Sequence, residues 1–231
     1  MSLRTKIMFL AMLILLSAIN VLAEAPTWFS NVVKQRRSGS KEKTTQEFIE
    51  DLWDTINSIS EKYQMDPVFI TAVIAIESNF SNVQGPGGVL GMMQILPSTA
   101  KSIAKLLNLE VPKDWNQLLT DYKLNITYGT AYLSYLYKKT GSLVKALESY
   151  NNGKNKTTYA QTVMKQYDYY KSLHEKEMQT KQEELKKQQK NVLATNNQPL
   201  TQSGTQTIIQ EQQTVESTES TNSTNTNNSG K

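Results

Sequence analysis

The sequence contains no cysteine and only one histidine, His174, among its 231 residues. The absence of cysteine excludes disulfides, thiolate metal sites, cysteine nucleophiles and an N-terminal lipid-modified cysteine. A single histidine argues against a Ser-His-Asp triad and against a site with several histidine ligands. We therefore expect no metal and no cofactor, so any chemistry must come from carboxylates, amides and hydroxyls.

Net charge is also low, with 25 Lys and Arg against 21 Asp and Glu, which gives a formal charge of +4. Such a small excess does not indicate a nucleic-acid partner. It is compatible with an anionic polymer as the partner.

Long apolar runs are absent except near the start of the chain. Arg4 and Lys6 precede a ten-residue apolar run at 7–16. The small or apolar residues at 21–23, which end with Ala23, suit the positions that a signal peptidase reads. This pattern predicts a secretory signal over residues 1–23, cleaved after Ala23, and an exported, periplasmic protein. The alternative is an uncleaved anchor on a membrane-bound protein, but a spanning helix needs about 20 apolar residues.

Composition divides the rest of the chain into four segments. Residues 24–43 are basic and poor in apolar side chains, which predicts a flexible linker; contact with a membrane surface is the second interpretation. Residues 44–173 form the expected core, and 174–190 form a densely charged helical extension. Residues 191–231 contain 27 Asn, Gln, Ser or Thr out of 41. Such a segment cannot bury enough apolar surface to offset its ordering entropy, so we expect disorder there.

The core has helical periodicity throughout, which predicts an all-α fold. A capping box of Thr44 with Glu47 starts the first expected helix, and Asp66 followed by Pro67 starts the second. A loop with four glycines follows at 79–91. Further helices are expected over 97–107, 121–139, 142–150 and 158–173.

Glu77 is the candidate catalytic residue. On a helix it shares the core-facing side with Ile70, Val73 and Ile74. Burial penalises the ionised carboxylate and raises its pKa, and an acid still protonated near neutral pH can protonate a leaving oxygen. The alternative is a half-exposed glutamate that binds local groups. The neighbouring Ser78 and the glycine-rich loop favour a site for glycosidic cleavage.

Five segments carry a family resemblance: ESNF at 77–80, GVLGMMQILPSTA at 88–100, NITYG at 125–129, SYNNG at 149–153 and YA at 159–160. Together they resemble the soluble lytic transglycosylase family of goose-type lysozyme-like enzymes, and the resemblance covers residues 45–173. The compact core is similar to the small members that serve secretion or conjugation machines, which would then be partners.

The resemblance implies cleavage of the β-1,4 bond between N-acetylmuramic acid and N-acetylglucosamine in peptidoglycan glycan strands, leaving 1,6-anhydro ends. Glu77 would be the acid, with no second carboxylate. The implied substrate-binding residues are Ser78, Met93, Gln94, Leu96, Tyr150 and Asn151. Tyr150 would lie over Glu77 and position it, Gln94 and Asn151 would bind the sugar, and Met93 and Leu96 would line the groove. A lysozyme-like hydrolase and a non-catalytic peptidoglycan-binding protein remain as alternatives.

Overall fold

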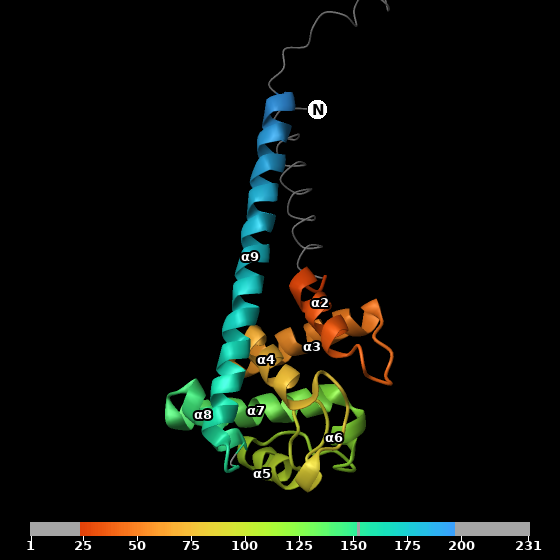
Figure 1. Ribbon diagram of the computed structural model, residues 1–231, viewed down its shortest axis with the longest axis vertical. Coiled ribbons are helices and arrows are strands. Elements are labelled where there is room, and N and C mark those ends of the chain that lie inside the picture. Colours follow the sequence, from red (N-terminus) through yellow and green to blue (C-terminus); the bar gives the residue numbers. More distant parts are fainter. Residues whose placement is uncertain (1–23, 152, 197–231) are drawn as a thin grey trace, which may run out of the picture. The chain divides into compact units, whose positions relative to one another are not determined.

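A computed structural model describes residues 24–151 and 153–196, and within these ranges the protein is all-α, as predicted. The chain divides into a compact unit that ends at Lys181 and a second unit that begins at Gln182. The expected signal over 1–23 and the tail from residue 197 lie outside the described residues. The helices are α2 (Thr27–Arg36), α3 (Gln46–Tyr63), α4 (Pro67–Ser78), α5 (Pro97–Leu107), α6 (Gln117–Thr120), α7 (Tyr122–Thr140), α8 (Leu143–Asn151) and α9 (Lys156–Asn196), with a 3₁₀ turn at Pro86–Gly88 (Figure 1).

Local capping signals explain most helix boundaries. The Asp66 carboxylate accepts a hydrogen bond from the Val68 amide at 2.7 Å, and Pro67 occupies the first helical position of α4, as predicted. Gly141 ends α7 with a φ of 68°. The predicted capping box is wrong by one residue, because Thr45 caps α3 by accepting from the Phe48 amide.

The expected linker at 24–43 is wrong for residues 27–36, which form α2 and pack into the main core. Trp28, Phe29, Val32 and Val33 are all buried. Phe29 lies 4.8 Å from Trp53 of α3, measured between ring centroids. The few apolar residues of this basic segment fall on one helical face, so a low average hydropathy conceals a complete packing surface.

The helix α9 holds α2 in place. The Glu177 carboxylate accepts hydrogen bonds from the Thr27 and Trp28 amides at 2.9 and 2.8 Å, and the Trp28 indole donates to His174 at 3.1 Å. An anionic group at a helix N-terminus satisfies unpaired amides and complements the helix dipole. The expected extension at 174–190 is helical, and its residues up to Lys181 belong to the compact unit. Residues 191–196, expected to be disordered, continue α9.

The core lies around α7, which packs against α3, α5, α6 and α8. The main apolar cluster joins α2, α3, α4, α7, α8 and α9, and a smaller cluster lies between α5, α7 and the loop before α5. None of the helices in the described ranges is both long and apolar enough to cross a membrane.

The packing of α2 predicts a large stability effect for Phe29→Ala, because this side chain is fully buried among aromatic rings. We expect a loss of about 3–5 kcal/mol in the free energy of unfolding, measured by urea denaturation. Lys34→Ala, on the exposed side of the same helix, is the control and should change stability by less than about 0.5 kcal/mol. Equal, small effects of both variants would contradict the packed position of α2.

Candidate active site

A cavity of about 640 Å³ opens between the end of α4, the glycine-rich loop, α7 and α8. It is lined by Glu77, Pro86, Val89, Gln94, Ile95, Leu96, Thr99, Tyr132, Tyr150, Asn151 and Gly153. Glu77 is the single carboxylate among the described lining residues. Its surroundings are tyrosine rings, aliphatic groups and amides, which suit the mixed apolar and polar faces of a sugar.

Glu77 projects from the last turn of α4, a helix that is buried over most of its length. The Tyr159 hydroxyl, from the first turns of α9, donates a hydrogen bond to Glu77 Oε1. Burial raises the pKa of Glu77 to about 7, and the hydrogen bond from Tyr159 opposes this rise because it favours the ionised form. The carboxyl can therefore hold or release a proton near neutral pH.

Asn125 fixes the loop that forms one wall of the cavity. Its side chain is fully buried and makes three hydrogen bonds: Oδ1 accepts from the Met93 amide at 2.7 Å, and Nδ2 donates to the carbonyls of Leu90 and Leu118 at 2.8 and 2.9 Å. Gly91, with a φ of 73°, lies against this amide, and a Cβ there would come within 2.3 Å of Asn125 Nδ2. Glycine is required at this close approach.

Tyr150 lines the cavity, but the structure corrects the role expected for its hydroxyl. The hydroxyl donates to the Met93 carbonyl at 2.8 Å, and the ring lies 5.3 Å from that of Tyr132. The tyrosine that binds Glu77 is Tyr159 instead. Tyr150 is half-buried near Glu77, and desolvation of its hydroxyl together with the negative charge of Glu77 raises the pKa of Tyr150 well above its usual value.

Ser78 and Met93, both expected to contact substrate, do not point into the cavity. The Ser78 hydroxyl donates to the Met92 carbonyl at 2.7 Å and thereby ties the end of α4 to the loop. The Met93 side chain is fully buried against α7, where a Cβ on Gly129 would come within 2.5 Å of its sulfur. Ser78 thus holds the loop through the Met92 carbonyl, and Met93 is held through its own backbone amide and carbonyl.

The other three expected residues line the cavity. Leu96 is 37% exposed there. The Gln94 amide nitrogen donates to the carbonyls of Val83 and Gly91, both at 2.8 Å, while Gln94 itself has a left-handed φ of 44°. Asn151 Oδ1 accepts from the Gly153 amide at 3.1 Å. Gln94 and Asn151 are thus held by local backbone at the edge of the cavity.

The family model of the transglycosylase SLT domain matches residues 54–174, which include all of α4 to α8 and the start of α9. The chain belongs to the transglycosylase SLT family. A membrane-bound lytic murein transglycosylase E of Buchnera aphidicola subsp. Baizongia pistaciae is 30% identical over 155 residues, which cover 62% of this chain and 69% of that protein. A transglycosylase of Enterobacteria phage PRD1 is 31% identical over 108 residues, 46% of this chain and 37% of that protein.

The solved structure of a 70-kDa soluble lytic transglycosylase in complex with bulgecin A has the same fold as this SLT domain. It superposes with a TM-score of 0.50 at 21% identity, covering 64% of this chain and 28% of that chain. The chain thus spans about two thirds of the length of one curated relative and well under half of others.

Two residues of the site, Tyr159 and Asn125, were not among those expected from the sequence. Both lie in the segments that carry the family resemblance, which is the signal that could have revealed them. Asn125 is also the amide side chain on the buried side of α7, beside Ile126 and Leu133. A polar residue in such a position must be hydrogen-bonded when it is buried.

The raised pKa of Glu77 predicts a pH-dependent penalty on stability. Glu77 binds its proton more tightly in the folded protein, so the wild type should lose stability as pH rises from about 4.5 to about 7, up to roughly 3 kcal/mol. Glu77→Gln removes this titration and should be the more stable protein at pH 8. Urea denaturation between pH 4 and 8 tests this, and parallel stability curves for the two proteins would refute it.

Proposed function

We propose that this protein is a peptidoglycan lytic transglycosylase, with Glu77 as its acid and base. The observation that carries the proposal is one carboxyl with a pKa of about 7, facing a cavity of about 640 Å³ and held by a tyrosine. Membership of the SLT family supports the same reaction, and the matched relatives are named murein transglycosylases or transglycosylase.

The hydrogen bond from Tyr159 occupies Glu77 Oε1, so Oε2 would carry the proton that enters the cavity. Glu77 would donate this proton to the oxygen of the β-1,4 bond between N-acetylmuramic acid and N-acetylglucosamine. The bond from that oxygen to the anomeric carbon breaks, and the N-acetyl oxygen of the same sugar stabilises the positive charge. Glu77, now ionised, takes the proton of the 6-hydroxyl, whose oxygen bonds to the anomeric carbon. The products are a free 4-hydroxyl and a 1,6-anhydro end, and no water is consumed.

The lining of the cavity favours this reaction over hydrolysis. Lysozyme-like hydrolysis in most glycosidases uses two carboxylates, as nucleophile or as a base for water. Among the described residues that line this cavity, Glu77 has no carboxylate partner. The substrate's own hydroxyl and N-acetyl group can supply what the second carboxylate would provide.

The remaining lining residues would hold the sugar. The Gln94 side-chain amide donates its hydrogens to the carbonyls of Val83 and Gly91, so its Oε1 would accept from a sugar hydroxyl or an N-acetyl amide. Asn151 would contribute polar contacts at the opposite rim, and Leu96 and Tyr132 would offer apolar surface to the ring faces.

We propose that the protein acts outside the cytosol, where its substrate lies, after export directed by the signal at 1–23. The compact catalytic unit suits local opening of the wall for a transenvelope secretion or conjugation apparatus. Its substrate would be the glycan strands of peptidoglycan.

Glu77→Gln tests the reaction, because the amide keeps the shape of the side chain but cannot donate a proton. We expect a folded protein that releases anhydro-muropeptides from purified sacculi at less than about 1% of the wild-type rate, measured by mass spectrometry. Reducing-end products from the wild type would indicate hydrolysis. Binding of sacculi by the wild type without release of either product would indicate a non-catalytic protein.

Tyr159→Phe should change the pH dependence as well as the rate. The hydrogen bond from Tyr159 favours ionised Glu77, so its loss raises the pKa of Glu77. The decline in kcat/KM above pH 7 should therefore move to higher pH. The rate at low pH should fall by about 10- to 100-fold, because the carboxyl is less well positioned. Tyr137→Phe, an exposed tyrosine of α7 away from the cavity, is the control; a decline that stays at the same pH in Tyr159→Phe would contradict the role of Tyr159.

A further inference from the structure

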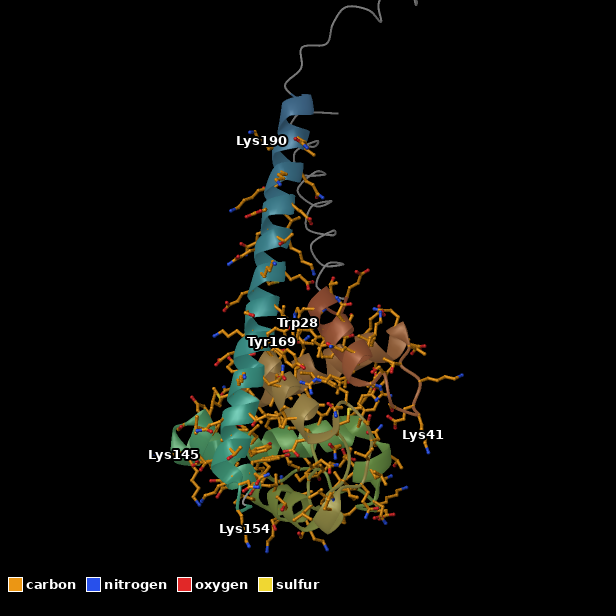
Figure 2. All side chains as sticks on the ribbon, in the orientation of Figure 1. Trp28, Lys41, Lys145, Lys154, Tyr169 and Lys190 are labelled. Atoms are coloured by element: carbon orange, nitrogen blue, oxygen red, sulfur yellow. The ribbon has the colours of Figure 1, made fainter. Side chains whose placement is uncertain are left out.

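A second cavity, of about 460 Å³, lies between α2, the end of α4 and α9. We call it the Arg36 pocket; its polar and aromatic lining includes Arg36, Asn79, Gln166, Tyr169 and Tyr170. Figure 2 labels Tyr169 close to Trp28, where α9 faces α2. Tyr169 is 56% exposed, so an aromatic side chain borders the entrance.

The charge of Arg36 is not neutralised within the pocket. Its guanidinium donates to Asn79 Oδ1 at 3.1 Å and to Gln166 Oε1 at 2.5 Å, both uncharged oxygens. In the part of the chain that the structure describes, Arg36 forms no ion pair. A half-buried guanidinium has five N–H donors, so it can still take up an anionic acceptor.

Tyr170 adds a second donor that is not used. The residue is 1% exposed, and its hydroxyl proton has no acceptor within hydrogen-bond distance among the described residues. Arg36 lies near enough to oppose the rise that burial causes in the pKa of Tyr170. Because a guanidinium can only donate, the phenolic proton still lacks an acceptor. A buried donor without an acceptor carries a desolvation penalty that an anionic ligand would remove.

The Arg36 pocket lies close to the reaction site. Asn79 is two residues beyond Glu77, and Arg36 and Asn79 also line a neighbouring cavity of about 480 Å³ that includes Val83. The carbonyl of Val83 accepts from Gln94, which lines the Glu77 cavity. The Arg36 pocket and the Glu77 cavity are thus linked through Asn79, Val83 and Gln94.

The helix α2 lies before residues 54–174, the part matched by the family model, so Arg36 is outside the shared domain. The pocket forms where α2 packs beside α9, so that Arg36 of α2 meets Asn79, Gln166 and Tyr170 of the matched domain there. Its chemistry needs an explanation separate from cleavage at Glu77.

We propose that the Arg36 pocket binds a carboxylate of the peptides that peptidoglycan carries on its muramic acid residues. This inference rests on the proposed function, which supplies the polymer. A carboxylate can accept two parallel hydrogen bonds from a guanidinium and one more from a phenol, which matches the donors of Arg36 and Tyr170. The site would hold a peptide-bearing strand beside the cleavage site and favour it over bare glycan.

The experiment compares two substrates, peptide-bearing glycan strands and the same strands stripped of peptides by an amidase. Arg36→Gln should raise KM about 10-fold on peptide-bearing strands and leave kcat unchanged, with no change in KM on stripped strands. Tyr170→Phe should have the same pattern with a smaller effect, and it leaves the contact between Arg36 and Asn79 in place. Lys34→Gln removes a charge from the exposed side of α2 and should leave KM and kcat unchanged on both substrates.

Equal losses on both substrates would overturn the proposal, because Arg36 would then act on Glu77 through Asn79. No change on either substrate would overturn it as well. If the wild type cleaves neither substrate, the proposed function fails. Calorimetric titration of wild type and Arg36→Gln with the amidase-released peptides still tests the pocket: weaker binding by the variant supports it, and equal binding or none refutes it.

Discussion

The buried amide of Asn125 is the contact on which the geometry of the site depends. It binds the loop before α5 at Leu90 and Met93 and α6 at Leu118, so three backbone groups from two segments share one side chain. With the loop fixed, the carbonyls of Met92 and Met93 face the hydroxyls of Ser78 and Tyr150. The wall of the cavity is therefore built from backbone, and α7 determines its position.

This arrangement tolerates strained backbone near the catalytic carboxyl. Asn79, Phe80 and Gln94 are not glycine, yet they have φ values of 51°, 60° and 44°. Each such residue costs of order 1 kcal/mol and persists only where the surroundings determine it. Arg37, buried at the end of α2, donates to the Phe80 carbonyl, and the Gln94 side chain returns to its own loop. Backbone strain at Asn79 and Phe80 thus lies within three residues of the catalytic candidate Glu77.

Patterns that act over short distances made much of the fold predictable. Asp66 with Pro67, Gly141 and the apolar spacing along α3 and α4 determine helices through local chemistry, and the structure confirms them. The helix α2 was missed because average composition conceals four apolar residues on one face. Its stability comes from Trp53 and Glu177, residues that the sequence places far away.

The site was predictable in position but less so in contacts. The apolar face around Glu77 correctly predicted a desolvated carboxyl with a raised pKa. Which tyrosine reaches it could not be predicted, since Tyr150 and Tyr159 both lie near and only the entry angle of α9 decides between them. The side chains of Ser78 and Met93 contact the loop and the core rather than the cavity, a distinction that a sequence motif does not make.

The hydrogen bond between Glu77 and Tyr159 also affects when the site can form during synthesis of the chain. The two residues are 82 positions apart, and α9 follows every other helix of the compact unit. A ribosome releases the chain from its N-terminus, so Glu77 emerges long before the helix that orients it. Glu177, which caps α2, emerges later still. An unfinished or truncated chain therefore contains the acid without its complete setting, and the site forms only when synthesis of the unit is nearly over.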